Sequence, residues 1–308
     1  MRAVVQNSVG GPDVLFVAEQ PDPSPRPGEV LVRVKAAGIN PVDGAVRGGF
    51  YPLLGEPPFI LGWDISGTVA ALGAGVTAFK VGDDVFGMPR FPKQAGGYAE
   101  LASAPANELA AKPAAIDHAH AAALPLASLT AWQGLVRHGG LQAGQRALIH
   151  AGAGGVGHLA VQIAKARGAY VVSTASPNKL GFVRSLGADE VIDYTKEDFA
   201  QTAGDFDLVL EPLGGDHAED SLRVLRDGGV LVSLLDVRDT TKAHAKERNI
   251  RVERMSVVPD REGLVELARL VDAKKLSPHV AKAFPLDQAG AAHAFLATRP
   301  IGKVVLTV

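Results

Sequence analysis

The sequence predicts an α/β protein in which a parallel sheet, covered by helices on both faces, is combined with a β-rich part. Two observations support this class. Short β-branched runs separated by glycine and proline turns fill the chain through about residue 110, and strand and helix signals alternate after about residue 117. Strands that alternate with helices are typical of a doubly wound parallel sheet.

The N-terminal part contains short runs that we expect to form strands, and it shows no helical periodicity of useful length. The proline-rich stretch Pro21–Pro27 separates two of these runs, and Gly-Asp and Gly-Gly pairs mark further turns. A compact β-rich domain is therefore expected. The strands are expected at Met1–Val5, Leu15–Glu19, Glu29–Ala37, Ile65–Ala71, Asp84–Phe86 and Tyr98–Ala102.

The later part changes character with an Ala-rich helix, which is expected from His118 to Leu135 with an interruption at Pro125. Apolar residues then recur from Val156 to Ala164 at i, i+3, i+4, i+7 and i+8, which is the period of an amphipathic helix. Further helices are expected at Asn178–Leu186, Asp220–Arg226 and Gly263–Ala273. Strands are expected at Arg146–Ala151, Tyr170–Thr174, Glu190–Asp193, Phe206–Leu210, Gly229–Leu235 and Lys303–Val308.

Composition limits the classes of function. A chain of 308 residues suits two domains, and 47% hydrophobic with 21% charged residues is ordinary globular composition. The net charge of −2 gives no general attraction for nucleic acid or anionic membrane, so neither partner is expected. The chain has no cysteine, which excludes disulfides and thiolate zinc sites. The start MRAVVQNSVGG does not resemble a signal peptide, and no apolar run approaches 18 residues, so a cytoplasmic location is expected.

The strongest chemical signal is a glycine-rich turn between a predicted strand and a predicted helix. Its first glycine permits a tight turn, its second lets the backbone approach a pyrophosphate, and its third lets the helix pack closely on the sheet. The phosphates would lie at the helix N-terminus, where unpaired N–H groups and the dipole favour negative charge. The alternative, a turn without a ligand, is disfavoured by the strand–turn–helix context. The turn is Gly152-Ala153-Gly154-Gly155-Val156-Gly157, which satisfies G-x-G-x-x-G and predicts a Rossmann-type sheet.

The next strand indicates which dinucleotide binds. An NAD site usually carries an acid about 20 residues after the first glycine, and here the strand ends without one. Ser173, Thr174 and Ser176 can instead donate hydrogen bonds to a 2′-phosphate, and Lys179 follows with a positive charge. We therefore expect NADPH. Lys179 as a solvated helix residue is the alternative.

Several segments, in one order along the chain, carry a family resemblance. With the glycine turn they span nearly the whole chain. They are Ala36–Asp43, Ile60–Gly67, Val81–Gly87, Gly96–Glu100, Leu124–Trp132, Leu186–Tyr194 and Gly302–Leu306. On these segments the chain resembles the zinc-free, zeta-crystallin-like quinone oxidoreductase branch of the medium-chain dehydrogenase/reductase superfamily.

The resemblance implies a Rossmann dinucleotide-binding domain, residues 118–261, inserted into a β-rich GroES-like catalytic domain formed by residues 1–117 and 262–308. The cofactor and substrate would lie between the two domains, as is common for small-molecule sites. Members of the family are typically homodimers.

The resemblance also indicates whether the protein binds a catalytic zinc ion. Zinc alcohol dehydrogenases of the superfamily have Cys where this chain has Asn40, and His-Glu where it has Trp63-Asp64. Thiolate and imidazole hold tetrahedral zinc, and asparagine and tryptophan do not replace them, so no metal is expected. Alcohol oxidation is not expected without a Lewis acid. A quinone or enone is a better hydride acceptor, because it needs positioning and modest hydrogen-bond donation.

In the family, the residues that match Asn40, Asp43, Tyr51 and Thr130 lie around the nicotinamide end of the cofactor. Asn40 would anchor the cofactor or a carbonyl oxygen, and Tyr51 would donate a hydrogen bond to the accepting oxygen. Each has a plainer alternative: Asn40 could stabilise a turn before Pro41, and Tyr51 could be an apolar wall.

Three other positions qualify this picture. Ala45 stands where relatives often have tyrosine, which leaves the identity of a proton donor open. Tyr194 and Lys303 match residues that contact the cofactor phosphates or ribose, although Tyr194 could simply end the third strand of the parallel sheet. The nine histidines form no recognisable metal cluster, and His150, before the glycine turn, is expected to be a hydrogen-bonded structural residue.

Three functions remain open on the sequence. The first is an NADPH-dependent quinone oxidoreductase, and a close alternative is reduction of the double bond of a 2-alkenal or enone. The third is a non-catalytic NADPH-binding protein with a structural, sensory or nucleic-acid-binding role, which a basic surface would favour. Turnover of NADPH with quinones distinguishes the enzymes from the third function.

Overall fold

The computed structural model describes residues 1–202 and 204–308, which form two units. The sequence places the domain boundaries at residues 117/118 and 261/262. Residues 275–277 join the second unit because the side chain of Gln162 bonds both backbone groups of Ser277, with N–O distances of 3.1 and 2.8 Å. The first unit is Met1–Leu129, Val258–Lys274 and Pro278–Val308, and the second is Thr130–Val257 and Lys275–Ser277.

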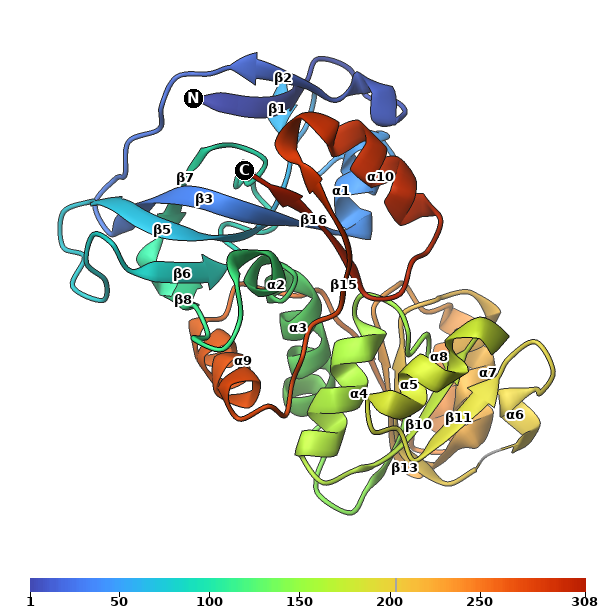
Figure 1. Cartoon of the computed structure of the whole chain (residues 1–308). Helices are drawn as coiled ribbons and strands as arrows, with labels where there is room; N and C mark the ends of the chain where they lie inside the picture. The colour runs from blue at the N-terminus through green and yellow to red at the C-terminus, as the bar shows by residue number, and fades with distance from the viewer. Residues whose placement is uncertain (203) are drawn as a thin grey trace. The chain divides into compact units, whose positions relative to one another are not determined.

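The first unit contains two sheets (Figure 1). One has the strand order β2-β1-β4, and the other has the order β15-β16-β3-β5-β6-β8, with β7 also paired to β3. The C-terminal strand β16 lies antiparallel to β3, so the last strand of the chain joins a sheet built mostly from the N-terminal part. The strands are β1 Arg2–Gln6, β2 Phe16–Glu19, β3 Glu29–Ile39, β4 Phe59–Ile60, β5 Asp64–Leu72, β6 Asp84–Gly87, β7 Leu101–Pro105, β8 Leu109–Ala111, β15 Val280–Pro285 and β16 Lys303–Thr307.

Alternation in β3 shows why this part of the chain forms strands. Val30, Val32 and Val34 are buried in one apolar core, whereas Arg33 and Lys35 between them are exposed. Successive side chains of a strand point to opposite faces, so one face of β3 enters the core and the other meets solvent.

The helices of the first unit include two, α1 and α10, that the sequence analysis did not expect. The helices are α1 Pro41–Arg47, α2 His118–Ala122, α9 Arg261–Asp272 and α10 Ala289–Ala297, and α3 Pro125–Trp132 runs from this unit into the second. Helix α1 was missed because seven residues are too few for a visible apolar period. Its start was nevertheless marked, since Asn40 is the N-cap, Pro41 is the first helical residue and Asp43 completes the capping box.

The second unit is a six-stranded parallel sheet in the order β11-β10-β9-β12-β13-β14. Numbered within the sheet, this is the order 3-2-1-4-5-6 of doubly wound dinucleotide-binding folds. The predicted Rossmann-type sheet is therefore confirmed. Its strands are β9 Arg146–Ile149, β10 Tyr170–Ala175, β11 Glu190–Asp193, β12 Phe206–Glu211, β13 Leu225–Ser233 and β14 Arg251–Arg254, and its helices are α4 Gly157–Ala166, α5 Leu180–Ser185, α6 Phe199–Thr202, α7 Asp216–Val224 and α8 Asp239–Glu247.

Elements that the sequence reading missed are weakly patterned. In α8 the buried side chains are Thr241 and Ala245, so the apolar stripe that reveals a helix is almost missing. Strand β15 keeps one side chain buried, Phe284, and shows no clear alternation. No helix among the described residues is long and apolar enough to cross a membrane.

Candidate functional site

The glycine loop lies between β9 and α4, as the sequence predicts, and the structure shows why glycine is required at two positions. A Cβ at residue 152 would lie 2.0 Å from the hydroxyl oxygen of Ser173, and a Cβ at residue 157 would lie 2.1 Å from the carbonyl oxygen of Ala151. Both distances are far inside van der Waals contact. A side chain at residue 157 would force the helix away from the backbone of Ala151, and one at residue 152 would displace the Ser173 hydroxyl from its bond to Ile149.

Gly154 differs from these two glycines. A Cβ at residue 154 would meet one neighbouring atom within 4 Å, the carbonyl oxygen of Ala151 at 3.2 Å. The space on the side of Gly154 where a side chain would point is therefore open. An open backbone beside the N-terminus of a ten-residue helix suits a pyrophosphate, because first-turn N–H groups have no intrahelical acceptor and the helix dipole favours an anion. The loop therefore fits the phosphates of a dinucleotide.

The hydroxyl groups at the end of β10 do not all have the role that the sequence suggested. Ser173 is fully buried and donates to the carbonyl oxygen of Ile149 at 2.7 Å. Thr174 is 3% exposed, and its hydroxyl oxygen accepts the backbone N–H of Ala151 at 3.1 Å. Both groups are thus engaged inside the protein.

Beyond β10, the candidates for the 2′-phosphate are more accessible. Ser176 caps a 3₁₀ turn, Pro177–Lys179, and its hydroxyl donates to Asn178 at 2.9 Å. Lys179 ends that turn and is partly exposed. Tyr194 follows the neighbouring strand β11 and is 56% exposed. Because β10 and β11 are parallel neighbours, these side chains follow the same edge of the sheet.

The same edge carries residues that the sequence reading missed. Strands β9 and β12 are neighbours where the strand order reverses, which is where such sheets bind ligands. Glu211, the buried last residue of β12, accepts the N–H groups of Leu213 and Gly214 at 2.5 and 2.8 Å. Leu213 and Leu235, on the loops after β12 and β13, are 45% and 46% exposed. Their position shortly after or at the end of two predicted strands was the only signal in the sequence, and their exposure is known only from the structure.

In the first unit, Asn40 and Asp43 are joined at the junction of β3 and α1. The backbone N–H of Asn40 donates to Asp43 Oδ2 at 2.7 Å, and that of Gly62 donates to Oδ1 at 3.2 Å. Asp43 is completely buried, and burial raises its pKa to about 7 despite these two donors. Asp43 therefore positions the backbone around Asn40.

The side chain of Asn40 belongs to a buried ionic cluster with Asp64 and Lys303. Its Nδ2 donates to Asp64 Oδ2 at 2.8 Å, and its Oδ1 accepts a hydrogen bond from Lys303 Nζ. Lys303 also donates to the carbonyl oxygen of Ile39 at 3.0 Å and lies 3.5 Å from Asp64 Oδ2. Burial lowers the pKa of Lys303 and raises the pKa of Asp64, opposing their mutual attraction. The expected contact of Lys303 with the cofactor stays a prediction.

A hydrogen-bonded chain continues from Asp43 toward Arg47. Arg47 can only donate, so its guanidinium donates to His293 Nδ1 at 3.1 Å. His293 Nε2 then donates to the hydroxyl of buried Tyr98 at 3.3 Å. Burial raises the pKa of Tyr98 well above its usual value, and Asp43 adds to this through its charge and a hydrogen bond. Burial lowers the pKa of His293 to about 3, so this ring is neutral.

The remaining candidates lie apart from this cluster. Tyr51 follows α1 on a surface loop and is 45% exposed, with Phe50 beside it 88% exposed. Thr130 lies on α3 in the second unit and is 5% exposed. The sequence-predicted residues therefore divide between the two units. The first unit holds the Asn40–Asp43–Lys303 cluster and, on a separate loop, Tyr51, and the second unit holds Thr130, the glycine loop and the strand ends that follow it.

At the positions where zinc alcohol dehydrogenases have metal ligands, the side chains of this protein are engaged in hydrogen bonds with other protein groups. The Asn40 amide bonds Lys303 and Asp64, the Trp63 indole N–H donates to Lys93 at 2.7 Å, and Asp64 also accepts the N–H of Leu126 at 2.7 Å. Within residues 1–202 and 204–308, no group of three or more His, Cys, Asp or Glu side chains is placed to bind a metal ion.

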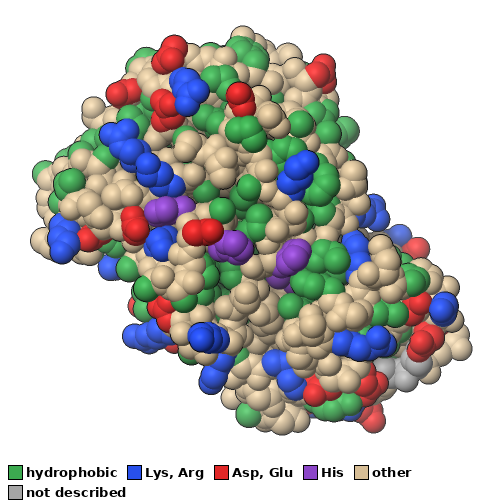
Figure 2. Space-filling view, in the orientation of Figure 1, with side chains coloured by type: hydrophobic (Ala, Val, Ile, Leu, Met, Phe, Trp, Pro, Cys, Tyr) green, Lys and Arg blue, Asp and Glu red, His purple; other side chains and the backbone are tan. Residues whose placement is uncertain are grey.

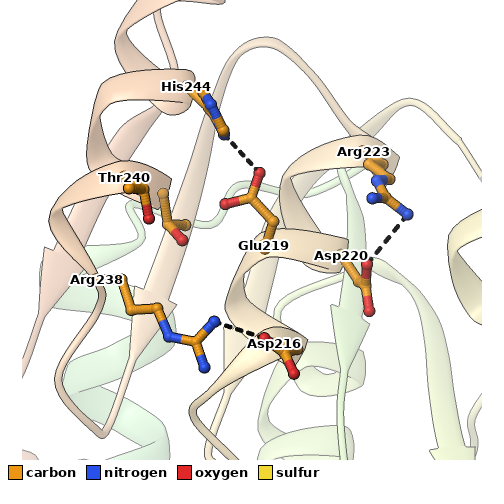
Figure 3. Close-up of a pocket in the computed structure, with 8 residues that line it drawn as sticks. Asp216, Glu219, Asp220, Arg223, Arg238, Thr240 and His244 are labelled. Atoms are coloured by element: carbon orange, nitrogen blue, oxygen red, sulfur yellow. Dashed lines mark hydrogen bonds and ion pairs between the residues drawn. The ribbon is translucent and has the colours of Figure 1, made fainter.

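A pocket of about 330 Å³ lies between α7 and α8 in the second unit (Figure 3). Its charged side chains pair with one another: Arg238 with Asp216, Arg223 with Asp220 and His244 with Glu219. Acidic and basic side chains are also interspersed on the face shown in Figure 2. This pocket is separate from the candidates that the sequence predicts.

Comparisons with known proteins agree with this architecture. Residues 26–114 match the alcohol dehydrogenase GroES-like domain, and residues 186–306 match the family described as zinc-binding dehydrogenase. An NADPH-dependent alkenal/one oxidoreductase of Arabidopsis thaliana is 41% identical over 76% of this chain, which spans 62% of that relative's length.

Two solved structures are similar over the whole chain. The quinone oxidoreductase from Coxiella burnetii is 36% identical with a TM-score of 0.94, covering 100% of this chain and 99% of that one. The Escherichia coli quinone oxidoreductase complexed with NADPH is 30% identical with a TM-score of 0.89, and both chains are covered completely.

Fold and site together define an oxidoreductase of the medium-chain dehydrogenase/reductase type, with a GroES-like part and a Rossmann sheet. The chain belongs to the quinone oxidoreductase branch of that superfamily.

The neutral state of His293 leads to a testable dependence of stability on pH. Its pKa is about 3 in the folded protein and about 6.5 when unfolded, so as the pH falls below 6.5 the unfolded state gains a proton and the fold loses stability. Glutamine can accept from Arg47 and donate to Tyr98 without titrating. Between pH 7 and pH 5 we expect the free energy of unfolding of His293→Gln to gain about 2 kcal/mol relative to the wild type, measured by urea denaturation.

The matched control is His244→Gln. Glu219 raises the pKa of His244, so this pair contributes stability at low pH that is lost as the pH rises. Relative to the wild type, the free energy of unfolding of His244→Gln should therefore fall as the pH is lowered. An unchanged difference between wild type and His293→Gln at the two pH values would show that His293 takes up protons in the folded state.

Proposed function

We propose that the protein is an NADPH-dependent quinone oxidoreductase that transfers a hydride to a quinone or related conjugated carbonyl without a metal ion. The observation that carries this proposal is the glycine loop at the reversal of strand order, followed by Ser176 and Lys179 where an NAD site would have an acid. The NADPH named for the relatives from Arabidopsis thaliana and Escherichia coli supports it.

Each group of residues has a part in this proposal. Gly152, Gly154, Gly155, Val156 and Gly157 would receive the pyrophosphate, and Ser176, Lys179 and Tyr194 would contact the 2′-phosphate and its ribose. Thr130 and Lys303 complete the proposed cofactor-binding residues, together with Thr174, which would act through the glycine loop because its hydroxyl bonds the N–H of Ala151.

The proposed reaction needs positioning and a donor to the accepting oxygen. When bound, NADPH supplies a hydride, and reduction of a quinone to a hydroquinone also takes up one proton. Tyr51, exposed on its loop, would donate a hydrogen bond to the oxygen on which negative charge develops. Asn40, whose amide is fixed by Asp64 and Lys303, and Asp43, which fixes the backbone of Asn40, would shape the acceptor site.

A second candidate is reduction of the carbon–carbon double bond of a 2-alkenal or enone. The 41% identity to an alkenal/one oxidoreductase favours it. The hydride from NADPH would then be transferred to a carbon atom of that double bond, and the acceptor would not be a quinone. The homodimer that the family resemblance implies and the cytoplasmic location expected from the sequence stay predictions.

Oxidation of NADPH, followed at 340 nm with quinones, enones and 2-alkenals, tests the function. We expect turnover with at least one quinone at an ordinary enzymatic rate of about 1 s⁻¹ or more, and the same rate after treatment with a chelator. NADPH binding without turnover of any acceptor would reject the proposal, and loss of activity on chelation would reject the absence of a metal.

Lys179→Ala tests the choice of cofactor. A charge-assisted bond to phosphate is worth enough that its loss should raise the Kd for NADPH roughly tenfold to a hundredfold, with little change for NADH, which lacks the phosphate. Lys242→Ala, at an exposed lysine paired with Asp239, is the matched control. Equal losses for the two dinucleotides would remove Lys179 from the phosphate site.

Tyr51→Phe tests the donor to the substrate. Loss of one hydrogen bond in the transition state should lower kcat roughly tenfold, whereas the Kd for NADPH should stay nearly the same. Tyr170→Phe removes a surface hydroxyl that bonds Glu190 in the second unit, and it serves as the control. An unchanged kcat in Tyr51→Phe would leave Tyr51 as an apolar wall.

A further inference from the structure

The imidazole ring of His150 lies buried immediately before the glycine loop, and the proposed function gives it no role. It is 1% exposed and packs edge-on against Phe199, with ring centroids 4.5 Å apart. Its Nδ1 lies 3.3 Å from Thr174 Oγ1 and its Nε2 lies 3.1 Å from Ser221 Oγ. Both ring nitrogens therefore face hydroxyl groups.

The direction of each hydrogen bond follows from Ser221. Its hydroxyl donates to the carbonyl oxygen of His217 at 2.6 Å, which uses its single proton. Ser221 Oγ must therefore accept from His150, so the ring proton is on Nε2. Burial lowers the pKa of His150 to about 3, which leaves Nδ1 without a proton. The hydroxyl of Thr174 must then donate to Nδ1.

Thr174 in turn holds the beginning of the glycine loop. Its hydroxyl oxygen accepts the N–H of Ala151 at 3.1 Å, and its carbonyl oxygen accepts the N–H of Gly152 at 2.9 Å. Ala151 has φ 55°, a left-handed conformation that residues with a side chain disfavour. Its carbonyl oxygen accepts the N–H of Gly154 at 2.8 Å and lies against Gly157, so the conformation of Ala151 orients the rest of the loop.

We propose that His150, Thr174 and Ser221 are positioning residues, which hold Ala151 in its left-handed conformation and thereby shape the loop for the dinucleotide pyrophosphate. This inference deepens the proposed function and rests on its cofactor site. It assigns the hydroxyl proton of Thr174 to the imidazole, so the 2′-phosphate is left to residues beyond β10. Because the pyrophosphate is common to NADPH and NADH, the three residues support both dinucleotides equally.

The test is Thr174→Val, which keeps the shape of the side chain and removes the hydroxyl. The Kd values for NADPH and for NADH, each titrated separately by calorimetry, should rise by the same factor of roughly three to ten. Thr174→Ser keeps the hydroxyl and should restore both affinities. His150→Phe should reproduce the loss, and the double variant should lose little more, because both substitutions remove the same hydrogen bond.

Thr241→Val is the matched control for a purely structural effect. Thr241 is a buried threonine of the same unit whose hydroxyl bonds Glu219 away from the loop. It should lower the melting temperature and leave both Kd values unchanged. If Thr174→Val lowers the melting temperature and changes neither Kd, the positioning role is rejected.

A loss of NADPH affinity without a loss of NADH affinity in Thr174→Val would also overturn the inference, because Thr174 would then contact the 2′-phosphate. Should the variant fail to fold, the ¹⁵N shifts of His150 in the wild type decide: an Nε2–H tautomer from pH 5 to 8 supports the network, and an Nδ1–H tautomer rejects it. Wild-type protein that binds both dinucleotides but reduces no acceptor would defeat the proposed function and leave this inference standing.

Discussion

The close contact between Gly157 and the carbonyl oxygen of Ala151 is the constraint on which the second unit depends. A Cβ at residue 157 would lie 2.1 Å from that oxygen. Residue 157 must therefore be glycine if the first turn of α4 is to lie this close to the end of β9. The N-terminus of α4 therefore lies close to the end of β9, and β9 is one of the two strands between which the strand order reverses. An anion there meets the positive end of the helix dipole and backbone N–H groups at once.

In the first unit, buried polar side chains are held in place by hydrogen bonds and charges among themselves. Asp64 and Lys303 are buried with opposite charges, and the Asn40 amide bridges them through both of its ends. A buried charge without a partner is strongly destabilising, so these residues fix one another. The cluster joins β3, β5 and β16, and it ties the C-terminal strand to the segment that carries Asn40 and Asp43.

The parts of the fold and of the candidate site that could be predicted are those marked by a pattern within one short segment of the sequence. The glycine loop, its flanking strand and helix, and the strand Glu190–Asp193 lie where the sequence places them, because a turn that needs glycine and a buried β-branched run both leave clear signals. Helix α8 and strand β15 were missed because most of their side chains are not buried, and burial is what imposes an apolar period. Helix α1 carried a capping box that a search for apolar periods could not detect.

By itself, the sequence determined the class of fold, the position of the glycine loop and the lack of thiolate ligands, since each depends on residue type and on spacing along one segment. The tertiary structure decided which polar groups are already engaged. Folding brings Lys303 to Asn40, 263 residues away in the chain, where it donates a hydrogen bond to the amide oxygen. It also brings the hydroxyl of Thr174 to the N–H of Ala151, which is 23 residues away. A hydroxyl has one proton to donate and a buried ammonium needs acceptors, so the neighbours that folding brings together decide what each group can offer a ligand.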